Sequence, residues 1–185
     1  MPRDYTDVPS SLIPDDTIAI VGMHIIAGGV GEDGMCKRSK EGDCEMLHCD
    51  FTVLDGEYKG RKVWQRFITE GTTDGQKQMV VRTLEMLKAI IDSALNLKPK
   101  DESDAARAAR TVSLKWFDGK SFMARIGHEE GSGNYPARNI VVSVITPDKK
   151  DYQPVEQPPP FDGGGGSAAA PTPSAPPVER PGWAQ

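Results

Sequence analysis

Residues 61–70 read RKVWQRFITE, and this stretch decides how the rest of the chain is interpreted. In a β-strand, successive side chains point to opposite faces of the sheet. One face of this strand then carries Val63 and Phe67 and can look into a core, while the other carries Trp64 between two cations. Such a face suits contact with phosphates and stacking of unpaired bases. Ordinary packing of the indole beside solvated edge cations would explain the same pattern.

Two further strands are predicted before this stretch. Residues 17–26 are β-branched and apolar on both faces, which is typical of a central, buried strand. Residues 45–54 alternate well, with Leu47, Cys49, Phe51 and Val53 on one face, and Asp55-Gly56 starts a turn into the opening stretch. Residues 27–43 hold five glycines between these strands and are predicted to form a mobile loop.

A helix and a second group of strands are predicted after it. Thr73 and Gln76 match a capping box at the start of a helix that runs to about residue 95. Val80, Leu84, Leu87, Ile91 and Ala94 form one apolar stripe along that helix. A shorter helix is predicted at 103–110. A hairpin is predicted to join strands 112–116 and 121–127, and the last strand spans 139–146.

This order predicts a mainly β protein with one long helix, an α+β fold. Three strands, a helix, then two or three strands is the order of a five-stranded oligonucleotide/oligosaccharide-binding (OB) barrel, whose second and third strands form the ligand face. We therefore expect an OB-like barrel of five to six strands with the helix between strands three and four. The predicted divisions are a lead-in at 1–15, the domain at 16–152 and a disordered Pro/Gly/Ala-rich tail at 153–185.

The charge of the chain is unevenly distributed. Its net charge is −5, so bulk electrostatics do not attract nucleic acid. Residues 1–36 already account for a net −5, whereas residues 105–150 carry a net +4, which permits a basic groove. No apolar run approaches the ~20 residues that span a bilayer, and the N-terminus has no apolar signal core. Three cysteines fit a reducing cytoplasm better than a disulfide framework, so we expect no membrane association and a cytoplasmic protein.

The candidate DNA-binding residues are cations that track a phosphate backbone and aromatic side chains that stack unpaired bases. They are Lys37, Arg38, Lys40, Tyr58, Lys59, Arg61, Lys62, Trp64, Arg66, Arg125, Tyr135 and Arg138. Trp116 of the later hairpin is a further candidate for stacking, but it alternates with Val112 and Leu114, which favours a place in the core.

Metal-binding and catalytic patterns are weak. The three cysteines are spaced eight and five residues apart, unlike the close ligand pairs of structural zinc sites, and Cys49 and His48 face opposite ways. His128-Glu129-Glu130 lacks the second histidine of a zinc-protease helix, and residues 28–31 are not followed by the Gly-Lys-Ser/Thr of a phosphate-binding loop. We expect no metal, no cofactor and no enzymatic activity.

The tail contains two isolated aromatic residues, Phe161 and Trp183, which are candidate partner-binding anchors. A plain solubilising tail accounts for the same composition. The two apolar faces of residues 17–26 fit either a barrel interior or the interface of a homo-oligomer.

The residues also carry a family resemblance. The runs DGEYKGRKVW at 55–64, IIDSA at 90–94, FDGKSFMA at 117–124, NIV at 139–141 and TPD at 146–148 come in that order. Over residues 16–152 the chain resembles an uncharacterised family of bacteriophage and prophage proteins. Those proteins lie among replication and recombination genes and are suspected of binding single-stranded DNA.

This resemblance implies a single-stranded-DNA-binding protein of phage-type DNA replication or recombination, in a bacterial host cytoplasm. The alternative is an adaptor for a phage recombinase or host replication protein that binds little DNA itself. The tail departs from bacterial single-strand-binding proteins, whose tails end in an acidic, hydrophobic tip, because residues 178–185 (VERPGWAQ) hold one acid and one base.

Overall fold

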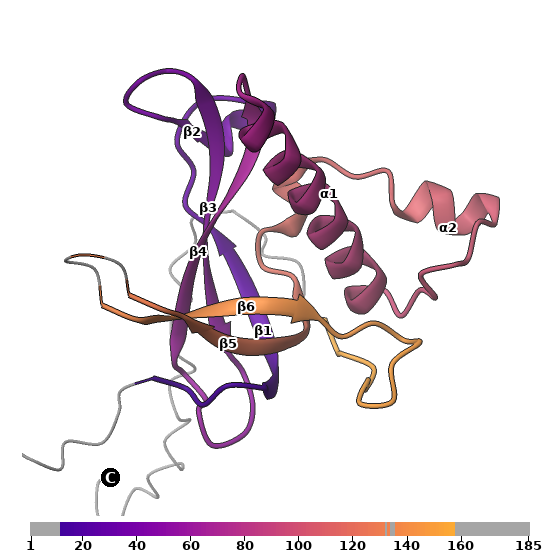
Figure 1. Cartoon of the computed structure of the whole chain (residues 1–185). Helices are drawn as coiled ribbons and strands as arrows, with labels where there is room; N and C mark the ends of the chain where they lie inside the picture. Colours follow the sequence, from indigo (N-terminus) through magenta and orange to yellow (C-terminus); the bar gives the residue numbers. More distant parts are fainter. Residues whose placement is uncertain (1–11, 132, 134–135, 158–185) are drawn as a thin grey trace, which may run out of the picture.

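The computed structural model describes residues 12–131, 133 and 136–157. Its described part is an antiparallel six-stranded sheet with one long helix beside it (Figure 1). The strands are β1 (Thr17–Ile25), β2 (Cys36–Arg38), β3 (Cys44–Val53), β4 (Lys62–Gly71), β5 (Ser121–Glu129) and β6 (Arg138–Val144). The helices are α1 (Asp74–Ala94), α2 (Asp104–Ala109) and two 3₁₀ turns, η1 (Glu32–Gly34) and η2 (Leu114–Phe117). The predicted class, mainly β with one long helix, is confirmed.

The strand β3 joins the two parts of the sheet. Along one edge it pairs with β2 and then with β1, and along the other edge it pairs with β4. Beyond β1 the sheet continues through β5 to β6. Within the described residues no backbone ladder joins β4 to β6, so the sheet is not closed. One link across this seam is the Val141 amide, which donates a hydrogen bond to Gln65 Oε1 at 2.9 Å.

The core lies on one face of the long strands, as their alternation predicts. Every second residue of β3 from Leu47 to Val53 is buried, and so are Val63 and Phe67 of β4. Phe51 makes edge-to-face contacts with Phe67 and with Phe122 of β5. These rings tie three strands together, because large aromatic side chains dominate the apolar area of a small core.

The helix α1 begins where the sequence predicts, but its apolar stripe is only partly buried. Thr73 and Gln76 form both hydrogen bonds of the capping box. Leu87, Ile91 and Ala94 are buried against the sheet. Leu84, however, is 60% exposed, so the N-terminal half of the stripe is not fully buried against the sheet.

A buried carboxylate fastens the end of α1 to the segment that follows. Asp92 is almost fully buried and accepts hydrogen bonds from Lys88 Nζ at 2.8 Å and Arg110 Nε at 2.7 Å. Arg110 also donates to the carbonyls of Lys98 and Asp101. The loop before α2 is therefore held by one guanidinium.

The predicted hairpin between residues 112–116 and 121–127 is wrong. Residues 114–117 form η2, and β5 pairs with β1 and β6 instead. The cause lies in Asp118, whose carboxylate accepts a hydrogen bond from the Ile25 amide at 2.8 Å. The Gly119 amide also donates to the Met23 carbonyl, so the turn delivers the chain to the edge of β1 rather than back on itself.

Residues 27–43 are also more ordered than predicted. They contain η1 and β2, and Cys36 of β2 is buried in the core. Arg38 of β2 donates to Glu45 Oε1 at 2.7 Å, which helps hold this short strand against β3.

Ordered structure extends beyond the predicted domain at both ends. Ile13 is buried in the core, and its amide donates to Asn139 Oδ1. At the other end Tyr152 Oη donates to the Ser93 carbonyl, and the Gln157 side chain bonds the Ala94 carbonyl and both backbone groups of Ser121. Residues 158–185, which include Phe161 and Trp183, lie outside the described residues. None of the helices that are described has the length and apolar composition needed to cross a membrane.

Replacing Arg110 tests the buried ion pair. We expect Arg110→Ala to lower the free energy of unfolding by about 3 kcal/mol, because it removes the main partner of a buried carboxylate. Urea denaturation followed by circular dichroism measures this value. The control is Arg107→Ala, whose exposed ion pair with Glu102 should contribute less than about 0.5 kcal/mol. Equal losses in the two variants would contradict the interpretation.

Candidate nucleic-acid interface

The outer face of β4 carries a row of exposed side chains, as the opening stretch predicts. Trp64 is 58% exposed and is the most exposed aromatic side chain that the structure describes. The strand register places it opposite Asp50 of β3, which in turn lies opposite His24 of β1. Because directly paired residues share a face, Trp64 stands on a surface made by three strands.

Lys62 and Arg66 flank the indole but differ in their partners. Lys62 Nζ lies 3.0 Å from Asp50 Oδ1, and the Asp50 carboxylate is buried. Arg66 is exposed, lies opposite His48, and makes no ion pair with any described residue. Arg66 therefore presents a free charge, whereas the charge of Lys62 is partly neutralised.

Two hollows lie on either side of Trp64. One, of about 230 Å³, runs across the seam between β4 and β6 and includes Arg61, Lys62 and Arg138 in its lining. The other, of about 240 Å³, includes Ile26, His48, Arg66 and Arg138. Trp64 and Arg138 line both. The indole thus divides a basic surface into two adjoining depressions.

The two loops that border these hollows come from distant parts of the sequence. Ile26 follows β1 and begins the long connection to β3. Ala137 ends the connection between β5 and β6, and Arg138 is the first residue of β6. Arg138 is held by an ion pair with Glu129, the last residue of β5. The site therefore combines one strand face with two loop ends.

His48 is a member of this surface that sequence reasoning did not select. Its pKa is lowered, first by burial and then by the nearby charges of Arg66 and Lys37. Its Nε2 atom is buried and makes no hydrogen bond to any described residue. The structure therefore favours a neutral imidazole with an unused polar atom beside Arg66. Its position opposite Arg66 follows from the register of β3 with β4, which the alternating pattern alone does not fix.

The other candidate residues are spread over the molecule. Lys37 lies near His48, whereas Lys40 and Lys59 are exposed in loops. Tyr58 is partly buried against the core, which leaves its ring less open to stacking than that of Trp64. Tyr135 lies outside the described residues.

Two of the candidate arginines point to acidic partners elsewhere. Arg38 binds Glu45 on the inward side of β2 and β3. Arg125 lies in β5 and contacts Asp16 at 3.2 Å and Asp151 at 3.9 Å. Neither lines the two hollows beside Trp64. Trp116 is partly buried and packs against the core beside Phe117, as its alternation with Leu114 favours.

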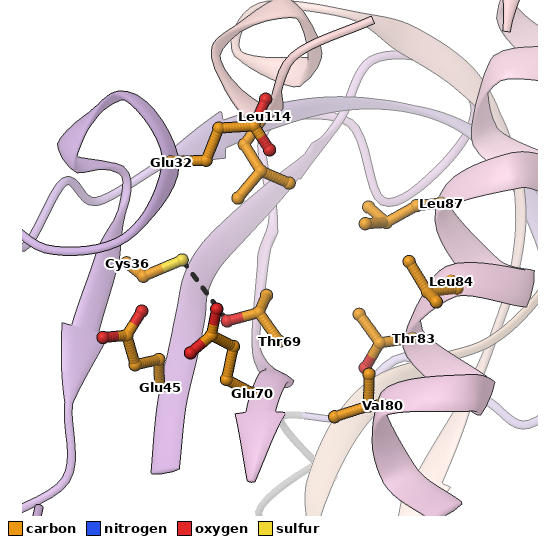
Figure 2. A pocket seen from close by; sticks show the side chains of 10 residues that line it. All are labelled: Glu32, Cys36, Glu45, Thr69, Glu70, Val80, Thr83, Leu84, Leu87 and Leu114. Carbon is orange, nitrogen blue, oxygen red and sulfur yellow. Dashed lines mark hydrogen bonds between the residues drawn. The ribbon is translucent and has the colours of Figure 1, made fainter. Parts of the chain in front are cut away.

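A different pocket lies on the other side of the sheet, between the β2–β3–β4 strands and α1. Figure 2 shows Val80, Leu84 and Leu87 on the helix facing Cys36 and three glutamates on the strand side. Its volume is about 160 Å³. The Cys36 thiol lies 3.4 Å from Thr69 Oγ1.

The two buried cysteines, Cys36 and Cys49, are poorly suited to nucleophilic chemistry. Burial raises the pKa of the Cys36 thiol, and the charges of Glu45, Glu70 and Glu32 raise it further. Burial also raises the pKa of Cys49 far above its ordinary value. A thiol must ionise to attack or to bind a metal, so both side chains act as small apolar groups here. Among the described residues no group of three or more His, Cys, Asp or Glu side chains is arranged to hold a metal ion.

Comparisons with known proteins add nothing to this geometry. No family model matches the chain, and no curated protein matches it either.

Titration of His48 tests the electrostatics of the face. We expect its pKa to lie below the ordinary 6.5, and to rise when Arg66→Gln removes a neighbouring positive charge. Histidine NMR signals recorded against pH measure both values, with Arg107→Gln as the control. In the folded state the His48 ring stays neutral at a pH where the unfolded state already binds a proton. His48 should therefore lower the free energy of unfolding as the pH falls below about 6.5. An unchanged His48 pKa in Arg66→Gln would contradict the proximity of the two groups.

Proposed function

We propose that this protein binds single-stranded DNA on the outer face of β3 and β4 and acts in phage-type DNA replication or recombination. The observation that carries the proposal is the exposed indole of Trp64 between two hollows lined by arginine and lysine. Unpaired bases stack on an aromatic face, and cations beside it can hold the phosphates that connect them. In a duplex the base faces are already stacked on each other, so this surface suits single strands better.

We further propose that the sheet is a partly open barrel of the OB type. The long strands β1, β3, β4, β5 and β6 follow the strand order of that barrel, with α1 after the third. The hydrogen bond from Val141 to Gln65 spans the position where the barrel would close. In such barrels the ligand lies on the second and third strands, between the first and last loops. In the proposed barrel, Trp64, Ile26 and Ala137 would occupy those three positions.

The parts of the surface suggest a division of labour. Trp64 would stack one base, and each adjoining hollow would receive part of a neighbouring nucleotide. Arg66 and Arg61 make no ion pair with a described residue and would therefore neutralise phosphates most readily. Arg138 and Lys62 would do so in competition with Glu129 and Asp50. The role of the protein in replication or recombination is supported by the family resemblance of residues 16–152.

The second candidate function is a protein-interaction adaptor for a recombinase or replication protein. The pocket of Figure 2 favours it, because an apolar helix face beside three carboxylates would repel nucleic acid and accept a peptide. The two functions are compatible, since the pocket and the Trp64 face lie on different sides of the sheet. In both cases we propose that the protein is not an enzyme.

Removing the indole tests the stacking surface. We expect Trp64→Ala to weaken binding to a fluorescently labelled single-stranded oligonucleotide by about 1–3 kcal/mol, the usual contribution of one stacked base. Fluorescence anisotropy at low salt measures the affinity, and urea denaturation should show a change in stability below about 0.5 kcal/mol. Trp64→Phe keeps an aromatic face, so its affinity for the oligonucleotide should lie between those of the wild type and Trp64→Ala. A loss of stability as large as the loss of binding would assign Trp64 to the fold instead.

The salt dependence tests the phosphate contacts. Each neutralised phosphate of a single strand contributes about 0.7 to the slope of log affinity against log salt concentration. Arg66→Gln should therefore reduce that slope by about 0.7. Lys149→Gln removes the same charge from an exposed turn after β6 and should leave the slope unchanged. Equal effects of the two substitutions would point to net charge rather than to a contact at Arg66.

The same titrations separate the candidate functions. No binding of the wild-type protein at low salt would end the proposal and leave the adaptor. Cleavage of the oligonucleotide in magnesium or manganese would show instead that the protein is a nuclease.

A further inference from the structure

The acidic pocket between α1 and the strands does not belong to the proposed DNA-binding face, and its chemistry defines a different occupant. Val80, Leu84, Leu87 and Leu114 give it an apolar wall. That wall is open, because Leu84 is mostly exposed and Val81 beside it is 55% exposed. Contiguous exposed apolar surface of this kind commonly marks a site where another segment docks.

The strand side of the pocket carries unbalanced negative charge. Glu45 is paired with Arg38, but Glu32 and Glu70 make no ion pair with a described residue. Their charges still reach into the pocket, since both raise the pKa of the Cys36 thiol. A suitable occupant therefore brings apolar side chains for the helix side and a cation for the strand side.

We propose that the occupant is residues 178–183 of this chain, which read VERPGW. This segment places Arg180 between two apolar side chains, Val178 and Trp183. The segment also holds Glu179, but Arg180 is the one Lys or Arg in residues 158–185, so no cation lies beside Phe161, the other aromatic residue of the tail. Charge and apolar content together thus select one segment of the tail.

The tail can reach the pocket from its anchor. Gln157 is bound to Ala94 at the C-terminal end of α1, and Leu84 lies ten residues earlier on that helix, about 15 Å away along its axis. A flexible chain of the length between residues 157 and 178 spans about 25 Å on average. The segment can therefore dock on its own molecule, and at high concentration it can dock on a second copy. This inference does not depend on DNA binding.

Nuclear magnetic resonance of the full chain tests the proposal through two sets of signals. Arg180→Glu and Trp183→Ala should each shift the methyl signals of Leu84 and Leu114, because they release the segment from the pocket. In the reverse direction, Glu70→Arg should move the indole signal of Trp183 toward the value of a solvent-exposed tryptophan. The double variant Glu70→Arg with Arg180→Glu should restore the original Trp183 signal, since the pair of charges is exchanged.

A second charge substitution on α1 serves as the control. Glu85→Arg introduces the same charge on α1 outside the pocket lining and should leave the Trp183 signal unchanged. Loss of the shifts on tenfold dilution would place the segment on a second copy, and their persistence would place it on the same molecule. Methyl signals that do not respond to either tail substitution would overturn the proposal, leaving the pocket to a different protein.

Discussion

The alternation of β3 and β4 is the constraint on which the rest of the molecule depends. Phe51 must face inward to contact Phe67 and Phe122, and this contact fixes the register of three strands. Once that register is set, the alternation of side chains places Trp64, Arg66 and His48 together on the opposite face of the sheet. The two-residue alternation along β3 and β4 therefore determines both which side chains pack in the core and which side chains form the candidate interface.

The same sheet serves two surfaces of opposite charge. On the outer face, Arg61 and Arg66 stand beside hollows and have no described acidic partner. On the side of α1, unpaired glutamates line an apolar pocket. Separation of this kind explains how a chain with a net charge of −5 can present a local basic surface. Binding of a polyanion and of a segment with an apolar side chain and a cation would thus occur without competition for the same residues.

Features that depend on residues close together in the sequence could be predicted, whereas features that depend on contacts between distant residues could not. The inward faces of β3 and β4 and the capping box at Thr73 follow from spacing alone, and the structure confirms them. The hairpin at Asp118 failed because its carboxylate bonds the Ile25 amide, a partner more than ninety residues away in the sequence. For the same reason the pairing of His48 with Arg66 and the place of Arg138 beside Trp64 needed the register and the loop positions.

The hydrogen bond from the Val141 amide to the Gln65 side chain links β4 and β6, which no described ladder joins. A hollow of the candidate interface lies across this seam, and its lining takes Trp64 from one side and Arg138 from the other. Strands that are not joined by a ladder separate more easily than paired ones. A ligand that contacts both β4 and β6 would stabilise the state in which these strands lie close together. Binding and the closing of the sheet would therefore reinforce each other.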